Sequence, residues 1–244
     1  MSRKTEPCST EEAAIIEVRD QDIGLATFDG ENRKVLQILA AASELFLEKG
    51  YDTVSMDAIA RGAAVSKATM YAHFASKEAL FAALIREECK ATAERMRPPS
   101  LDDARFEACL RQIADQFIDV FLDRRALAMH RIVFAEAWRF PEVRHAFLKW
   151  GPHHVQRMIA GLLEEACRRG LINLPDPHIG AIQFLSLISG DMPMEWHLGV
   201  APPTAAEMKK LVESGIKLFL NGYSVKAGTT GLKDAPHKVP APKR

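Results

Sequence analysis

The sequence has little of what marks extracellular or membrane-spanning proteins. Its four cysteines stand far apart and form no CxxC pair, so no disulfide framework is indicated. No membrane-length apolar run and no signal-peptide pattern occur, which predicts a cytoplasmic protein with free thiols and no membrane partner. A redox-sensing role for Cys89 or Cys109 stays open, but buried or incidental thiols are favoured.

The chain also lacks net charge and enzyme signatures. Lys plus Arg number 32 and so do Asp plus Glu, so any nucleic-acid contact must come from a local basic patch. No GxSxG, phosphate-loop or Rossmann glycine pattern is present. His153 and His154 are adjacent and point apart on a helix, without a third ligand at metal spacing. We therefore expect no enzyme activity, no cofactor and no metal site.

One stretch is set apart by a further absence. No Asp or Glu occurs from Ala58 to Lys77, although Arg61, Lys67 and Lys77 are present. Residues 53–81 read TVSMDAIARGAAVSKATMYAHFASKEALF. This stretch predicts three short helices, each preceded by a serine whose side-chain oxygen can accept from the first-turn N–H groups; these serines are Ser55, Ser66 and Ser76. The short Gly-Ala-Ala link between the first two helices predicts a sharp turn, as in a helix-turn-helix.

The second of these helices carries the functional signal. Met70 and Phe74 fall on its inward side, whereas the opposite side is centred on Ala68 and Ala72. Hydroxyl groups and cations border this outward side, and carboxylates are missing from it. Such a slim surface suits a DNA groove. The alternative is a generic helical hairpin with an incidental alanine-rich face.

At these residues a family resemblance emerges. The segment from Arg33 to Phe81 resembles the N-terminal DNA-binding domain of the TetR family of bacterial transcriptional regulators. It has the Gly50-Tyr51 pair after the first amphipathic helix and a matching second-helix start from Thr53 to Ala60. It continues with the VS-K-x-T-hydrophobic-Y-x-HF-x-SKE-x-L run. Ala64 stands where the family usually has glycine, which implies mild strain or a slightly altered turn.

The resemblance and the helix face together give a set of expected DNA contacts on a palindromic double-stranded operator. Residues of the second helix are expected near base edges; they are Lys67, Ala68, Thr69 and Ala72. Hydroxyl, phenol, imidazole and cationic groups are expected at phosphates; they belong to Thr53, Ser55, Tyr71, His73 and Lys77. Arg33 completes the predicted DNA-binding set.

The fold class is predicted to be all-α, with an N-terminal three-helix DNA-binding domain and a larger helical domain. Helical periodicity without strand alternation covers 33–50, 76–97, 101–123, 126–140, 152–169, 177–198 and 204–224, with a kink at Pro193. We expect a poorly ordered arm over 1–31, a DNA-binding domain over 32–78, a ligand-binding and dimerisation domain over 79–225, and a disordered tail over 226–244. Arg3 and Lys4 leave DNA contacts of the arm open.

The last two predicted helices carry more apolar surface than one small bundle needs. The family resemblance implies that they pair with the same helices of a second subunit, giving a homodimer with a doubled DNA site. The expected interface residues are Gly180, Phe184, Leu187, Ser189, Leu211, Val212, Gly215 and Phe219. The alternative is that these helices only complete a monomer core.

The body from residue 126 onward is rich in Met and aromatic side chains, and its RIVFAEAWRFPEV stretch is similar to the AefR-like subgroup. That resemblance implies a cavity for a small-molecule effector. The expected lining residues are Met129, Val133, Glu136, Trp138, Phe140, Trp150, Phe184, Met192 and Trp196; ordinary core packing is the alternative for each. For Glu136 we favour an ion pair with Arg139 or Arg131 over a ligand contact.

These observations predict a sequence-specific DNA-binding transcriptional regulator, a repressor released from its operator by a small apolar or amphipathic ligand. Two other functions stay open. One is an activator of the same fold. The other is a small-molecule-binding helical protein whose DNA-binding domain is vestigial.

Overall fold

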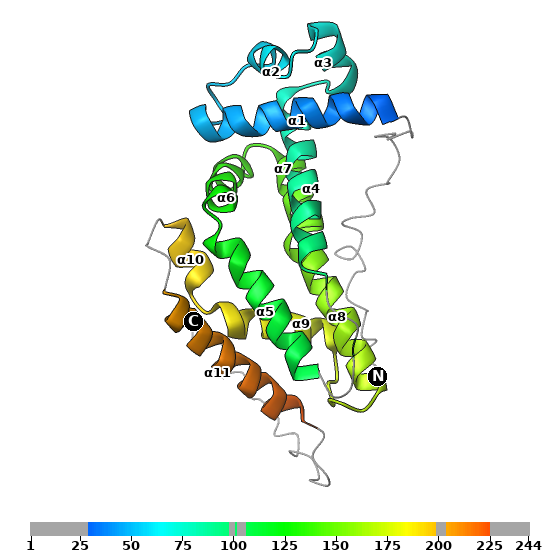
Figure 1. Ribbon diagram of the computed structural model, residues 1–244, viewed down its shortest axis with the longest axis vertical. Coiled ribbons are helices and arrows are strands. Elements are labelled where there is room, and N and C mark those ends of the chain that lie inside the picture. Colours follow the sequence, from blue (N-terminus) through cyan, green and yellow to red (C-terminus); the bar gives the residue numbers. More distant parts are fainter. Residues whose placement is uncertain (1–28, 98–100, 102–105, 199–203, 225–244) are drawn as a thin grey trace, which may run out of the picture.

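The computed structural model describes residues 29–97, 101, 106–198 and 204–224, with the side chains of 29–32, Trp196 and His197 excepted. The predicted arm lies outside these residues except for the start of the first helix, and the predicted tail lies wholly outside them. All regular secondary structure in the described part is helical, so the predicted all-α fold is confirmed. The first three helices form one end of an elongated molecule (Figure 1).

The structure contains the following helices in chain order. They are α1 (Asp29–Lys49), α2 (Met56–Gly62), α3 (Lys67–His73), α4 (Lys77–Arg95), α5 (Phe106–Leu122), α6 (Arg124–Glu136), α7 (Pro141–Trp150), α8 (Pro152–Arg168), α9 (Pro177–Ser189), α10 (Met192–His197) and α11 (Ala205–Tyr223).

Three helical segments of the body differ from expectation for local reasons. Helix α7 lies between the predicted ranges 126–140 and 152–169, because Pro141 occupies the first turn of a new helix, where proline is tolerated. The helix expected over 177–198 with a kink at Pro193 is two helices, α9 and α10, because Gly190 adopts a positive φ of 54° and ends α9. Pro193 lies in the first turn of α10, where proline is tolerated. Helix α6 begins earlier than expected because the Asp123 side chain accepts from the backbone N–H groups of Arg125 and Ala126, at 2.8 and 3.2 Å.

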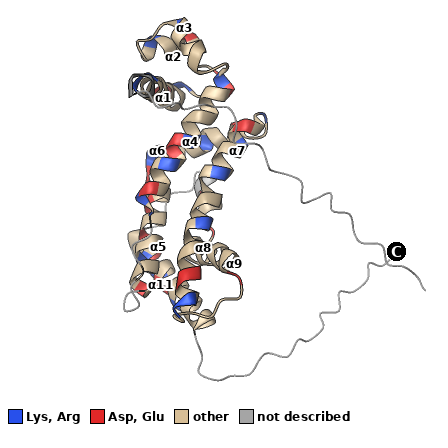
Figure 2. Ribbon diagram, turned by 90° about the vertical axis from the view of Figure 1, so that its right-hand side faces the viewer, with Lys and Arg blue, Asp and Glu red and all other residues tan. Residues whose placement is uncertain are grey.

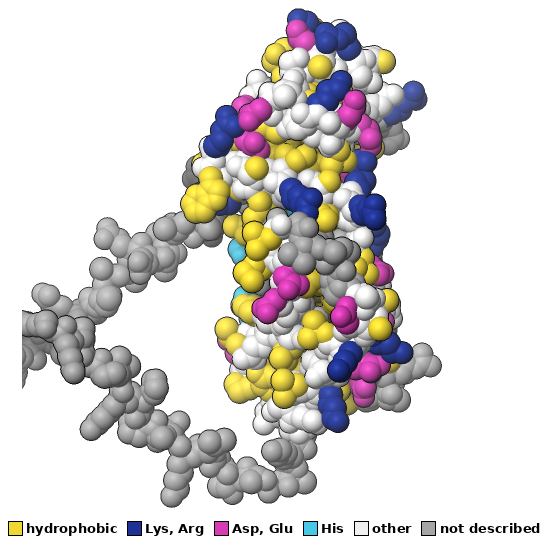
Figure 3. All heavy atoms as spheres, turned by 90° about the vertical axis from the view of Figure 1, so that its left-hand side faces the viewer, with side chains coloured by type: hydrophobic (Ala, Val, Ile, Leu, Met, Phe, Trp, Pro, Cys, Tyr) yellow, Lys and Arg dark blue, Asp and Glu magenta, His cyan; other side chains and the backbone are white. Residues whose placement is uncertain are grey.

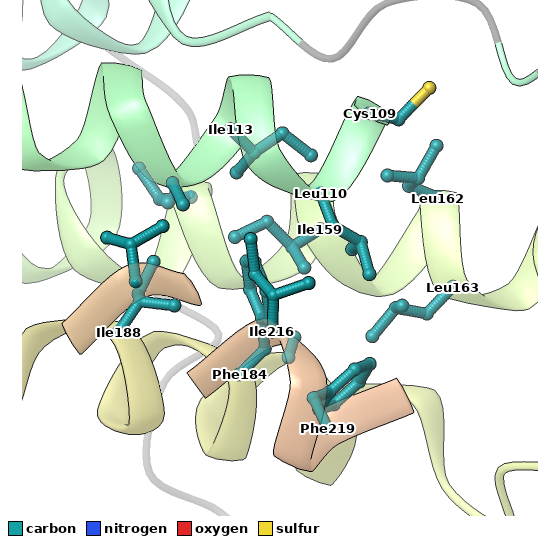
Figure 4. Close-up of a cluster of buried hydrophobic side chains, with 14 of the residues drawn as sticks. Cys109, Leu110, Ile113, Ile159, Leu162, Leu163, Phe184, Ile188, Ile216 and Phe219 are labelled. Atoms are coloured by element: carbon teal, nitrogen blue, oxygen red, sulfur yellow. The ribbon is translucent and has the colours of Figure 1, made fainter. Parts of the chain in front are cut away.

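The core of the body lies between α5, α8, α9 and α11 (Figure 4). Ile113 from α5, Ile159 from α8, Phe184 from α9 and Phe219 from α11 point toward one another and are almost fully buried. The rings of Phe184 and Phe219 meet edge to face at 5.3 Å. These contacts join α5, α8, α9 and α11 into one apolar cluster.

Helices α9 and α11 approach so closely that one position between them requires glycine. A Cβ atom added at Gly215 would lie 2.7 Å from the carbonyl oxygen of Leu187 and 3.0 Å from its carbonyl carbon. These atoms belong to the backbone and cannot move aside without shifting a helix. The crossing of α9 and α11 is therefore fixed by the missing side chain at Gly215.

We predict that Gly215→Ala destabilises the protein by roughly 1–3 kcal/mol, because the added methyl group overpacks the α9–α11 crossing. The matched control is Gly161→Ala in the middle of α8, where a Cβ would meet nothing within 4 Å. That variant is expected to gain about 0.5–1 kcal/mol from helix propensity. Urea unfolding at one fixed protein concentration measures both. Equal effects of the two variants would contradict the close crossing.

Candidate nucleic-acid interface

The three predicted helix caps of the N-terminal unit are present. The hydroxyl oxygens of Ser55, Ser66 and Ser76 accept from the backbone N–H groups three residues on, at 3.2, 3.0 and 3.1 Å. Each cap satisfies an N–H group that the first turn would otherwise leave free. The starts of α2, α3 and α4 are therefore fixed by sequence-local hydrogen bonds.

The turn between α2 and α3 contains a strained alanine. Ala64 has a φ of +52° and is the one non-glycine residue with positive φ in the described chain. The preceding residue, Ala63, keeps a right-handed helical conformation with φ −82°. The turn closes through a hydrogen bond from the N–H of Val65 to the carbonyl of Ala60, at 3.0 Å. The mild strain expected at Ala64 is thus present in the backbone.

The orientation of α3 follows the predicted division of its faces. Met70 is fully buried against the cluster that holds Ile38, Phe46 and Ile59. Ala68 and Ala72 are exposed, as are Lys67 and Tyr71, whereas Thr69 and His73 are half-buried. Within the described residues, the outward side of α3 does not pack on the protein's own body. It is open to a partner.

The other predicted DNA-binding residues lie around the same end of the molecule, and three of them have internal partners, since the Ser55 hydroxyl caps α2. Thr53 is exposed, and its hydroxyl donates to the carbonyl of Lys49 at 2.5 Å. The Lys77 ammonium donates to the carbonyls of Tyr51 and Val54, at 2.9 and 3.1 Å. It also lies 4.2 Å from the centroid of the Tyr51 ring. Lys77 therefore holds the loop between α1 and α2 in place. Arg33 and Ser55 are exposed.

The N-terminal unit shares its core with the body. One buried cluster joins residues of α1, α2 and α3 to Leu80, Phe81 and Leu84 of α4, and further to Met129 and Val133 of α6. Tyr51 packs on Phe81 and Phe140, with ring centroids 4.9 and 5.5 Å apart. Burial raises the pKa of the Tyr51 phenol well above its ordinary value, so the phenol stays neutral. The boundary expected after Glu78 falls inside the first turn of α4, and the apolar contacts continue across it.

Two arginines attach α6 to the N-terminal unit at both of its ends. Arg125 contacts Glu44 at 2.7 Å and donates to the Ser43 hydroxyl at 2.8 Å, both on α1. Arg139, just beyond the other end of α6, contacts Asp52 at 3.0 Å and Glu136 at 3.1 Å. The favoured pairing of Glu136 with Arg139 is confirmed. Sequence analysis missed the contacts to Asp52 and Glu44, because no local pattern relates residues so far apart in the chain.

Comparison with known proteins agrees with this arrangement. The family described as "Bacterial regulatory proteins, tetR family" matches residues 38–84, and "AefR-like transcriptional repressor, C-terminal domain" matches residues 108–225. Among solved structures, the flavonoid-responsive regulator FrrA is 39% identical with a TM-score of 0.70, over 80% of this chain and 100% of that one. The chain belongs to the TetR family of bacterial regulators. Both sequence resemblances, to the family and to its AefR-like subgroup, are confirmed.

Curated relatives of this TetR-family chain carry the same kind of name. The HTH-type transcriptional regulator UidR of Escherichia coli (strain K12) is 33% identical over 140 residues, which is 57% of this chain and 69% of UidR. The HTH-type transcriptional activator FasR of Mycolicibacterium smegmatis is 48% identical over 50 residues, which is 20% of this chain and 23% of FasR. The family consists of DNA-binding regulators rather than enzymes. None of the described helices is long and apolar enough to cross a membrane.

The residues expected to line an effector cavity are divided between two cores in this TetR-family structure. Met129 and Val133 belong to the cluster shared with the DNA-binding unit, and Phe184 and Met192 to the cluster of the body. Trp138 is 89% exposed. Phe140 and Trp150 are half-buried, Glu136 is buried beside Arg139, and the Trp196 side chain lies outside the described part. A surface hollow lies elsewhere, along polar residues of α5 such as Arg111, Asp115 and Asp119.

The residues expected at a dimer interface lie mostly inside one subunit. Gly180, Phe184, Ser189, Val212, Gly215 and Phe219 are buried, and Leu187 and Leu211 are half-buried. They build the α9–α11 pair itself. The exposed sides of these helices carry other residues, namely Ile179, Ile182 and Leu218.

The surroundings of Cys89 and Cys109 agree with the favoured expectation that they are buried or incidental thiols rather than redox sensors. Cys109 is buried in the core of the body. Burial also raises the pKa of the Cys89 thiol to about 12. The Cys89 sulfur therefore stays protonated near neutral pH, the form that reacts poorly.

We predict that Ala64→Gly stabilises the protein by about 0.5–1 kcal/mol, because glycine adopts a positive φ without the steric cost that a Cβ atom brings. The adjacent Ala63→Gly is the control with the opposite expected sign, since Ala63 has an ordinary negative φ and a buried methyl group. It is expected to lose about 0.5–1 kcal/mol. Urea unfolding midpoints measure both, and a loss of stability in Ala64→Gly would contradict the strain at this turn.

Proposed function

We propose that this TetR-family protein is a repressor that binds a palindromic operator as a homodimer and leaves it when a small apolar or amphipathic ligand binds. The observation that carries the proposal is the exposed, slim outward side of α3 around Ala68 and Ala72. In this proposal residues 32–78 read DNA, residues 79–225 bind the ligand and the second subunit, and the protein acts in the cytoplasm.

On the operator, α3 lies in the major groove of each half-site. The two alanines allow the helix backbone to approach the base edges, with Lys67 and Thr69 beside them. Tyr71 and His73 at one border, together with Thr53, Ser55 and Arg33, hold the phosphates that flank the groove. Lys77 contributes through the α1–α2 loop, because its ammonium already donates to three carbonyls of that loop, those of Tyr51, Asp52 and Val54. Its role is to keep Thr53 and Ser55 at the correct distance from the DNA backbone.

The homodimer forms through the outer sides of α9 and α11. Ile179, Ile182 and Leu218 are 48%, 36% and 59% exposed, and small residues, Ser186 and Ser214, lie among them. Hydrophobic side chains are numerous on the face that includes α6, α10 and α11 (Figure 3). Burying such side chains against a second copy removes apolar surface from water. A two-fold dimer then presents two copies of α3 at a fixed spacing.

The ligand belongs to the body, where Phe, Met and Ile side chains form an adaptable apolar interior. FrrA is named as flavonoid-responsive, which supports an aromatic, amphipathic ligand for this chain as well. Helix α6 connects the two functions because its ends are attached to α1 and to the α1–α2 loop. The ligand changes operator affinity only to the extent that it prefers one placement of α6 over another.

A second candidate function is activation of transcription by the same DNA binding. FasR, an activator by name, matches part of this chain. The two functions differ in where the operator lies relative to the promoter rather than in the geometry of α3. Transcription in vitro from a promoter that contains the selected operator separates them. Repression lowers the transcript, and activation raises it.

Selection of duplexes from a random library tests the proposed function directly, since a palindromic consensus sequence is the expected result. We then predict that Tyr71→Ala weakens binding to the selected operator about tenfold, the loss expected for one hydrogen bond to a charged phosphate. Tyr71 is 52% exposed, so its removal leaves the core intact. Phe134→Ala, an aromatic of 48% exposure on α6, is the matched control and keeps wild-type affinity. Failure to enrich any sequence would contradict DNA recognition altogether.

We also predict that the double variant Ile182→Glu, Leu218→Glu is monomeric at concentrations where the wild type is dimeric, because two charges would be buried at the proposed contact. Operator affinity falls with the loss of the second half-site contact. Leu122→Glu, at a 40% exposed leucine of α5, is the control and stays dimeric. Sedimentation velocity measures the association state. A dimeric double variant would exclude the outer sides of α9 and α11 as the interface.

A further inference from the structure

The helix-turn-helix carries a single carboxylate, and that carboxylate is paired with the recognition helix. Asp57 is the only Asp or Glu from Thr53 to Ser76. It lies in the first turn of α2, and its side chain forms an ion pair with the ammonium of Lys67, the first residue of α3. Both side chains reach solvent, with 38% of Asp57 and 68% of Lys67 exposed. The pair therefore lies on the surface rather than in the core.

Asp57 halves the net positive charge of the segment from Thr53 to Ser76. From Thr53 to Ser76 the positive charges are Arg61 and Lys67, and Asp57 leaves a net charge of one. Figure 2 shows basic and acidic residues close together at the end of the molecule that α2 and α3 form. Binding to DNA of arbitrary sequence depends almost entirely on such charge, through the release of counterions from phosphates. A lysine held by a carboxylate contributes little to it.

We propose that Asp57 is a specificity-determining residue, which holds the Lys67 ammonium away from phosphates and so weakens binding to DNA of other sequences more than binding to the operator. The inference rests on the proposed function. In the operator complex α3 enters the groove, and contacts to base edges and to both half-sites supply most of the binding, whether or not the Lys67 ammonium also reaches a phosphate. In other complexes those contacts are missing, and the charge of the surface decides affinity.

A carboxylate at this place has a local role as well. In the first turn of α2, Asp57 interacts favourably with the helix dipole. This role does not require a lysine on a different helix. The ion pair with Lys67 connects the carboxylate to DNA binding. Replacing Lys67 removes this ion pair and leaves the interaction of Asp57 with the helix dipole in place, so the two roles can be measured separately.

The experiment compares Asp57→Asn with the wild type on two duplexes of equal length, the operator selected with the wild-type protein and a scrambled version of it. We expect Asp57→Asn to bind the scrambled duplex about three to ten times more tightly at low salt, the range expected for loss of an exposed ion pair plus one repulsive charge. The slope of log affinity against log salt steepens by up to about one unit, since Lys67 then reaches one more phosphate. Operator affinity changes less than about twofold, so discrimination falls.

Two further variants keep the result interpretable. Asp57→Glu retains the charge and is expected to bind the scrambled duplex as the wild type does. In a Lys67→Gln background, Asp57→Asn is expected to gain little, because the lysine that it would release is absent. Circular dichroism and the unfolding midpoint show whether each variant is folded, and only folded variants enter the comparison.

Several outcomes would overturn the proposal. An equal gain in affinity for both duplexes would show that the charge of Asp57 weakens binding to all DNA alike. An undiminished gain in affinity in the Lys67→Gln background would show that the ion pair is not the cause. Weaker binding of folded Asp57→Asn to the operator would make the carboxylate a DNA contact. If the wild type enriches no operator at all, the proposed function itself fails, which is a different result from an unresponsive Asp57→Asn.

Discussion

Two short helices cannot bury a core of their own, and this constraint shapes the N-terminal unit. Helices α2 and α3 have seven residues each, far below the length at which an isolated helix is stable. Their buried faces rest on α1 and on a cluster that continues into α4, α6 and α7. The unit that reads DNA is therefore packed onto the body, and the body sets the direction in which α3 points.

The polar contacts of this junction give α6 a special position. Arg125 and Arg139 hold its two ends to the N-terminal unit, and Arg139 touches both Asp52 on that unit and Glu136 on α6. An exposed ion pair contributes little to stability. Two ion pairs at opposite ends of α6 nevertheless fix the position of this helix relative to the N-terminal unit. A change in the body that moves α6 must break or carry along these contacts. Energetic coupling between the proposed ligand and DNA would pass through a helix held in this way.

The sequence predicted what local chemistry decides. Serine caps, the inward and outward sides of α3 and the strained Ala64 follow from residues within one or two turns of each other, and all are present. Contacts between distant segments left no such pattern, as with Arg139 and Asp52, or Asp57 and Lys67 on different helices. Composition identified apolar residues of α6 and α9 but not which core each joins, since Met129 and Phe184 look alike by periodicity. Small residues of α9 and α11 indicated a close crossing, yet a crossing within one chain and one between chains need the same residues.

Helix α4 has a mechanical consequence. It runs without interruption for 19 residues from the recognition unit, and Met96, just past its end, belongs to the core of the body. At 1.5 Å per residue this is a rigid lever of about 28 Å, so a tilt of roughly 5° at the body would swing its far end by about 2.5 Å. In a two-fold assembly the displacements at the ends of the two α4 helices add. A rearrangement of the body no larger than the repacking of a few side chains would then put the paired recognition helices out of step with the pitch of the double helix.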